Sequence, residues 1–172
     1  FTYGRRHTYP IPPYSTVLGL IANVLGIRNI PGQEEPCINE NCNCDYHKLK
    51  EVKISICGKF VAKTTEYTWL RYIEHIGGQI PAFIDILNEV NILIYLYHYD
   101  INFLEKIKET FENPVNDRSP LHLGRAEDWI VIEDLDYVDL VIDEINGNYG
   151  YFFWVPEKIF FDKFDFDKIE GV

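Results

Sequence analysis

Two segments with helical periodicity, separated by a strand-rich stretch, constrain the fold of this chain most. Apolar residues recur at helical spacing after Ser15, which is placed to cap the start of a helix that Gly26 can end. Asp100 can cap a second helix over Ile101–Phe111. The inward face of that second helix is expected to be Leu104, Ile107 and Phe111. The expected order of elements along the chain, with strands between and after these two helices, is that of an α+β fold.

The strands are expected between and after these helices. Val52–Cys57 and Phe60–Lys63 predict a hairpin around Gly58, and Val90–Tyr99 predicts a buried strand. Further strands are expected at Tyr67–Ile73, Trp129–Glu133, Tyr137–Ile142 and Tyr149–Val155. This order fits a ferredoxin-like β-α-β-β-α-β unit with an antiparallel sheet and its first strand missing.

Loops are expected at Phe1–Pro13, at residues 31–47 and at Asn113–Gly124, with an acidic tail at 157–172. The 172 residues suit one domain, and 47% hydrophobic content excludes intrinsic disorder. The chain begins at Phe1 and holds no Met, which suggests trimming. Without an apolar run of about 18 residues or a signal peptide, the expected compartment is the cytoplasm.

Charge is spread unevenly along a chain whose net charge is −11. Residues 1–33 hold three arginines and no acid, whereas residues 126–172 hold 3 basic and 13 acidic residues. An acidic protein is a poor non-specific nucleic-acid binder. A local basic entrance is still compatible with a specific RNA site inside a larger assembly.

That basic entrance interleaves cations with rings. Arg5 and Arg6 suit bidentate phosphate recognition, and rings around them suit stacking on unpaired bases. The rings are those of Tyr3, His7 and Tyr9. The alternative, weighed evenly, is a solvated loop whose tyrosines pack on the domain.

Two further places could contact RNA. Free amides at the predicted helix start, with Ser15 or Thr16, suit a phosphate, although ordinary capping by Ser15 is favoured. Near Gly124, Arg118 or Arg125 could contact RNA, but pairing of Arg125 with a neighbouring carboxylate fits as well.

Few residues are candidates for metal binding or catalysis. Cys37, Cys42, Cys44 and His47 have a C-x4-C-x-C-x2-H spacing that is irregular for zinc. Free thiols are therefore favoured over a purely structural zinc ion, and no cofactor is expected. Walker, G-x-G-x-x-G and G-x-S-x-G motifs are missing from the sequence. Tyr46, His47 and Lys48 offer a base and a cation for RNA cleavage, but neighbouring strand residues face opposite ways.

Two motifs carry a resemblance to a known family. Residues 9–21 (YPIPPYSTVLGLI) and 120–128 (PLHLGRAED) are similar to the CRISPR-associated protein 5 family, whose members are RAMP-superfamily subunits of type I Cascade surveillance complexes. The resemblance is nearest to subtype I-B. It implies a ferredoxin-like (RRM-like) palm with a β-hairpin thumb.

The resemblance also implies a role in antiviral defence. A family member grips the 5′ handle of the CRISPR RNA, beside the backbone subunit (CRISPR-associated protein 7) and the large subunit. In subtype I-C the family member itself cuts the transcript, whereas in subtype I-B a separate endonuclease does so. The expected function is therefore non-catalytic RNA binding, with a metal-independent endoribonuclease using His7 or His47 as the alternative.

Overall fold

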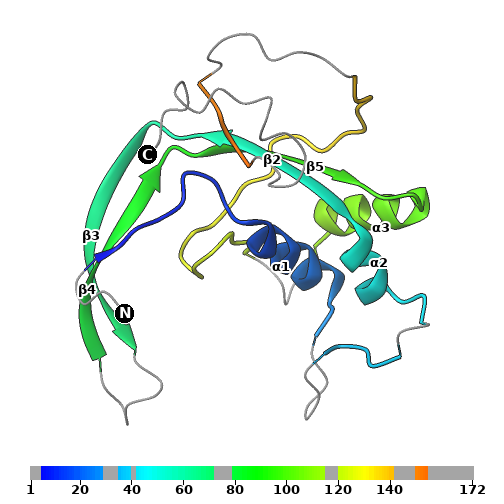
Figure 1. Cartoon of the computed structure of the whole chain (residues 1–172), viewed down its shortest axis with the longest axis horizontal. Helices are drawn as coiled ribbons and strands as arrows, with labels where there is room; N and C mark the ends of the chain where they lie inside the picture. Colours follow the sequence, from blue (N-terminus) through cyan, green and yellow to red (C-terminus); the bar gives the residue numbers. More distant parts are fainter. Residues whose placement is uncertain are drawn as a thin grey trace, which may run out of the picture. The chain divides into compact units, whose positions relative to one another are not determined.

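The computed structural model describes residues 5–28, 35–39, 42–71, 79–114, 120–141 and 150–154 (Figure 1). These residues group into two compact units. The first draws on Phe1–Ile11, Ile56–Leu93 and Tyr149–Val172, and the second on Pro12–Ser55 and Ile94–Asn148. Tyr3, Arg118 and the tail 157–172 lie outside the described residues. The single-domain assignment stays a prediction.

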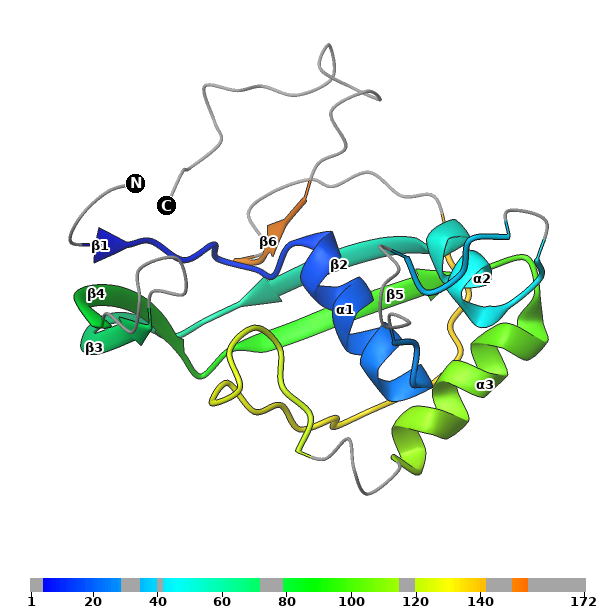
Figure 2. The same cartoon turned by 90° about the horizontal axis from the view of Figure 1, so that it is seen from below.

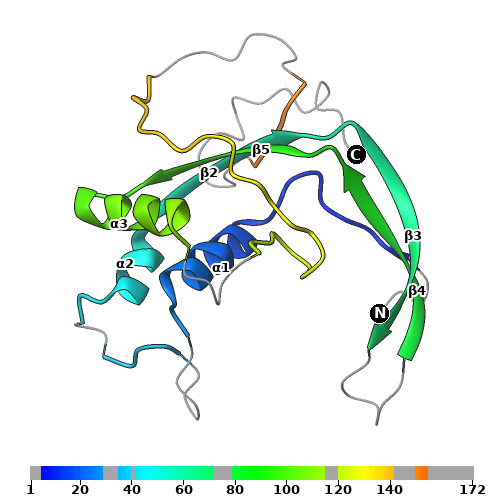
Figure 3. The same cartoon turned by 180° about the vertical axis from the view of Figure 1, so that it is seen from behind.

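The first unit is built on a long antiparallel hairpin. Strands β3 (Ala62–Arg71) and β4 (Gln79–Asn88) pair over their full length, from Ala62 opposite Asn88 to Arg71 opposite Gln79. The short strand β1 (Arg5–Arg6) adds to the other edge of β4 in parallel, which gives the order β1-β4-β3. Figure 3 shows the curvature of this hairpin. β1 corrects the prediction that the first thirteen residues lack regular structure: β4 presents an open edge, which pairs with the extended chain.

A second sheet has the order β5-β2-β6. It consists of β2 (Lys53–Lys59), β5 (Asn91–Tyr97) and β6 (Phe152–Phe153), with β6 antiparallel to β2. β5 confirms the strand expected near residues 90–99, but its side chains alternate between exposed and half-buried. It is therefore a one-sided strand and not the buried one that its apolar content predicted.

The second unit holds three helices, α1 (Tyr14–Leu25), α2 (Asp45–Glu51) and α3 (Ile101–Glu112). α1 packs on both α2 and α3 (Figure 2). Their contacting faces form an apolar core of Val17, Leu20, Ile21, Val24, Leu49, Phe103 and Ile107. Phe103 is buried although the inward face of α3 was predicted without it, and Leu104 and Phe111 are only half-buried.

The two long helices end largely as predicted, since their end signals are local. Asp100 accepts a hydrogen bond from the amide of Asn102 and caps α3. Gly26 ends α1 in the left-handed conformation, with φ 73°. The start of α1 differs: the N-cap is Pro13, without a side-chain cap, and Ser15 lies inside the first turn. The first three residues of α2 were predicted as part of a loop, and no helix was predicted there. Asp45 in its first turn and Lys48 and Lys50 in its last complement the helix dipole.

Gly58 lies within β2 and not at a hairpin turn. β2 ends at Lys59 and β3 pairs with β4, so the predicted hairpin around Gly58 is wrong. A Cβ atom at Gly58 would be 2.8 Å from the backbone oxygen of Asn91 and 3.2 Å from the side chain of Ile11. The position therefore requires glycine for a close backbone approach.

Residues 129–141 are not strands, contrary to the predictions for Trp129–Glu133 and the described part of Tyr137–Ile142. Trp129 makes an isolated bridge with His122. Asp134 and Asp136 each accept a hydrogen bond from the next backbone amide. These local bonds compete with the pairing that a strand needs.

The observed class is α+β, with antiparallel pairing of β3 with β4 and of β2 with β6, and it is compatible with the predicted ferredoxin-like fold. Within the described residues, the long hairpin is formed by β3 and β4. No helix within the described ranges has the length and apolar character needed to cross a membrane.

Two glycine substitutions test the close approach at β2. Gly58→Ala should lower the free energy of unfolding by about 1–3 kcal/mol, because a backbone oxygen cannot move aside as a flexible side chain would. Gly19→Ala is the matched control: Gly19 lies in α1 with nothing within 4 Å of the added Cβ. It should raise stability by about 0.5–1 kcal/mol. Urea unfolding measures both, and equal effects would contradict the assignment.

Candidate nucleic-acid interface

Three aromatic rings lie exposed on one side of the β3–β4 hairpin. Tyr67 is 55% exposed, Trp69 58% and Phe83 49%. Tyr67 pairs in register with Phe83, and paired residues of an antiparallel ladder share a face, as do alternate residues of one strand. The ring centroid of Tyr67 lies 5.3 Å from that of Phe83 and 6.2 Å from that of Trp69. We call these three residues the aromatic face.

A buried carboxylate lies farther along β4. One Asp85 oxygen is 2.9 Å from Nδ1 of His7, and the other accepts a hydrogen bond of 3.3 Å from the hydroxyl of Thr65. The Asp85 side chain is fully buried, whereas that of His7 is 73% exposed. Because a carboxylate only accepts hydrogen bonds, Nδ1 carries the hydrogen and the imidazole is held in one orientation. We call His7, Thr65 and Asp85 the Asp85 cluster.

The Asp85 cluster fixes how β1 lies on the hairpin. Arg5 is in register with Phe83 and Arg6 with Ile84, one step before His7 reaches Asp85. β1 thus runs along the strand that carries Phe83, and the side chain of Arg6 is exposed. The structure therefore brings two of the predicted cations to the sheet that bears the aromatic face.

The other predicted RNA contacts are distributed differently. Tyr9 is exposed and makes an edge-to-face contact with Trp154 at 5.6 Å, so it is partly engaged within its own unit. Ser15 and Thr16 lie in the first turn of α1 in the second unit, where the amide of Thr16 is bound to the carbonyl of Pro13.

Arg125 forms the intramolecular pair that the sequence allowed. Its guanidinium donates two hydrogen bonds to Asp128, at 2.9 and 2.7 Å, and its backbone amide donates a third at 3.2 Å. Gly124 has φ 108°, a conformation that favours glycine. The pair orders the loop between Leu121 and Ile130, whose ends are joined by a backbone hydrogen bond.

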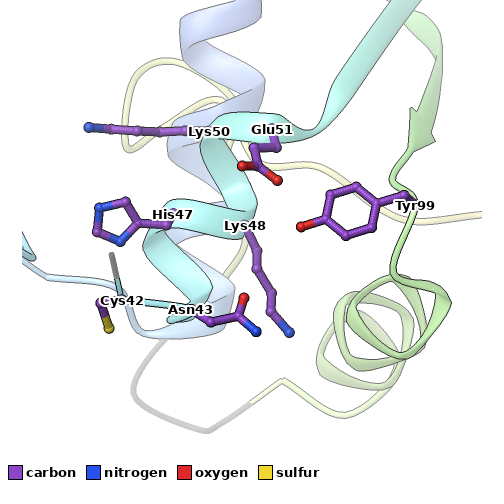
Figure 4. A pocket seen from close by; sticks show the side chains of 7 residues that line it. All are labelled: Cys42, Asn43, His47, Lys48, Lys50, Glu51 and Tyr99. Carbon is purple, nitrogen blue, oxygen red and sulfur yellow. The ribbon is translucent and has the colours of Figure 1, made fainter. Parts of the chain in front are cut away.

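The second unit also holds a pocket of about 330 Å³ (Figure 4). It is lined by Cys42, Asn43, His47, Lys48, Lys50, Glu51 and Tyr99. Lys48 donates to Asp100 at 2.7 Å and Lys50 to Glu35 at 3.1 Å. A hydrogen bond with Glu51 raises the pKa of Tyr99. The basic groups expected for RNA cleavage near His47 are thus paired with acids.

The three cysteines expected as loop thiols lie beside this pocket. Sγ of Cys44 is 3.2 Å from Nδ1 of His47. Hydrogen bonds with the backbone and side chain of His47 lower the pKa of the Cys44 thiol to about 6. The pKa of Cys42 is raised, chiefly by a hydrogen bond with Cys44.

One comparison with known proteins finds a similarity in the N-terminal part of the chain. Residues 1–74 match the family model described as CRISPR-associated protein (Cas_Cas5). Over these residues the chain is similar to the CRISPR-associated protein 5 family. A search of curated proteins finds no match to it. The family match includes β1, α1, α2, β2 and β3, and it confirms the resemblance seen in residues 9–21; it does not distinguish the subtype.

The aromatic face was missed from the sequence, although a signal existed. Tyr67 and Trp69 alternate with Glu66 and Thr68, which is the period of one strand face. A single acid, Asp85, interrupts the apolar run of β4 and indicates a specific partner. That the partner is His7, 78 positions away, depends on strand register that no local pattern specifies.

The Arg125–Asp128 pair should make stability depend on pH. Arg125 holds the pKa of Asp128 below its usual range, chiefly through its side-chain hydrogen bond. A carboxyl with a lowered folded pKa contributes stability that is complete above about pH 4 and is lost as the pH falls through the folded pKa. Asp128→Asn should therefore cost up to about 1 kcal/mol at neutral pH, since Asp128 is 38% exposed, and much less in acid. Urea unfolding of the native chain and of the variant, at neutral and at acidic pH, checks this prediction. A loss of unfolding free energy that is the same at both pH values would contradict it.

Proposed function

We propose that this chain is a non-catalytic RNA-binding subunit of a type I Cascade complex and that it anchors the 5′ handle of the CRISPR RNA in the cytoplasm. The family gives a CRISPR-associated role in a Cascade-like complex. The observation that carries the finer proposal is the aromatic face on the hairpin whose β4 strand pairs with Arg5 and Arg6.

Single-stranded RNA needs the surfaces that this sheet offers. Unpaired bases stack on exposed rings, and a sheet presents neighbouring rings at a spacing that successive bases can follow. Arginine adds bidentate contacts to phosphate. The handle of a guide RNA is a short single strand of defined position, so a small patch of rings beside two arginines is sufficient to hold it.

The acidity of the chain supports binding within an assembly. With a net charge of −11, the isolated subunit lacks long-range attraction to RNA. Neighbouring subunits would have to supply the positive surface for the rest of the guide. We propose the backbone subunit (CRISPR-associated protein 7) and the large subunit as these neighbours, in a complex nearest to subtype I-B.

A metal-independent endoribonuclease is the alternative, with His7 or His47 as the base. Acids neutralise Lys48 and Lys50 near His47, which weakens that candidate. Asp85 holds the exposed His7 in one orientation, as a general base requires, so His7 has to be tested directly. Incubation of the purified chain with CRISPR repeat RNA in EDTA separates the two functions. We expect intact RNA; cleavage at a single position, abolished by His7→Ala or His47→Ala, would replace our proposal with the enzyme.

Tyr67→Ala tests the aromatic face. Loss of one base–ring stack costs about 1–3 kcal/mol, so assembly of the complex on CRISPR RNA should weaken by about 5- to 150-fold. Tyr137→Ala is the matched control, because Tyr137 is 51% exposed but lies in the second unit. Titration of CRISPR RNA into the subunits measures both variants. Equal affinities of the two variants for CRISPR RNA would show that the aromatic face is not part of the RNA site.

The double variant Arg5→Ala plus Arg6→Ala tests β1. Charge-assisted contacts to phosphate are worth about 1.5–3 kcal/mol each, so handle binding should weaken by about two to four orders of magnitude. Lysine at both positions should restore only part of this, since it lacks the planar fork. Arg28→Ala, beyond the end of α1, is the control. Normal assembly of the double variant at physiological salt would show that β1 does not contact the handle.

A further inference from the structure

Four metal-ligating side chains converge in the second unit. The ligand atoms of Cys37, Cys42, Cys44 and His47 all lie within 4.8 Å of one another. Within the described part of the chain, these four side chains form the group whose ligand atoms are close enough together to hold a metal ion. Figure 4 shows Cys42 and His47 on the same side of the pocket. The cluster is separate from the aromatic face, which belongs to the first unit.

The local fold explains how an irregular spacing produces a compact cluster. Cys44 is the N-cap of α2 and His47 lies one turn later, so their side chains share a helix face. The Sγ atom of Cys44 is 3.2 Å from Nδ1 of His47. The amide of Cys42 donates to the carbonyl of Asn39, and Sγ of Cys37 is 3.8 Å from the same carbonyl. Cys37 and Cys42 are thereby folded back onto the start of α2.

The donor set and its spacing suit zinc. Three sulfurs and one imidazole nitrogen form a Cys₃His set, and zinc binds these with Zn–S bonds of about 2.3 Å and Zn–N bonds of about 2.0–2.1 Å. Ligand atoms at the corners of such a tetrahedron lie about 3.5–3.8 Å apart. The observed limit of 4.8 Å is reached without an ion, so a small contraction of the loop completes the site.

We propose that Cys37, Cys42, Cys44 and His47 bind one structural zinc ion, with Nδ1 as the ligand atom of His47. Four protein ligands leave no open coordination position, so the ion holds the loop against α2 and takes no part in catalysis. Zinc binds all three sulfurs as thiolates, so the thiol protons that are still present are released to solvent, without any change of oxidation state. The spacing favoured free thiols over a structural zinc ion, whereas the convergence of the four side chains supports the zinc ion.

Elemental analysis of the full-length chain, purified with a thiol reductant and without chelator, tests the proposal. We expect one zinc per chain and no stoichiometric iron. Cys44→Ser should lose most of this zinc. Cys57→Ser is the matched control, since Cys57 is the one cysteine outside the cluster and lies in β2. Loss of zinc from both variants, from neither, or stoichiometric iron in the native chain would overturn the assignment.

Cobalt keeps the proposal testable if Cys44→Ser fails to fold. After removal of zinc, the native chain and Cys57→Ser should each bind one Co²⁺ and show the intense visible bands and thiolate charge transfer of a tetrahedral Cys₃His site. Weak octahedral bands would overturn the proposal. A structural role also requires that chelation lower the unfolding temperature. Zinc whose removal abolishes RNA binding but leaves that temperature unchanged would overturn the structural assignment.

Discussion

The hydrogen bonds to Asp85 determine how the first unit is arranged. Burying an ionised carboxylate is costly unless donors replace the lost water. His7 and Thr65 supply such donors, from the segment after β1 and from β3. Any slip of β1 along β4 would move His7 away and leave the carboxylate short of a partner. The contact of His7 with Asp85 and the pairing of β1 with β4 together hold Arg5 and Arg6 on the sheet.

Local signals were enough to predict part of the fold. Asp100 and Gly26 mark the start of α3 and the end of α1, because capping depends on residues within one turn. Pairing between strands was not predictable in the same way. The apolar run before Gly58 indicated a strand, but its partners β5 and β6 are distant in the chain. For the site, the cations were found from composition, whereas the aromatic face became evident only from the register of Tyr67 with Phe83.

The second unit shows how one acid can serve several elements. Asp100 caps α3 and accepts a hydrogen bond from Lys48 of α2, which lowers its own pKa and raises that of the lysine. The same pairing removes a free cation from the neighbourhood of His47. A zinc ion on Nδ1 of His47 would also occupy the nitrogen nearest to Cys44. Structure-forming contacts thus use the groups that a nuclease would need there.

The position of β3 at the edge of the described sheet has a consequence for the isolated protein. An edge strand with exposed rings can pair with an identical edge on another copy, which leads to aggregation. Lys63 and Glu66 place opposite charges along β3, and the net charge of −11 makes copies repel one another. The acidity that weakens attraction to RNA therefore acts as colloidal protection. Neutralising acids to strengthen RNA binding would expose the free subunit to self-association.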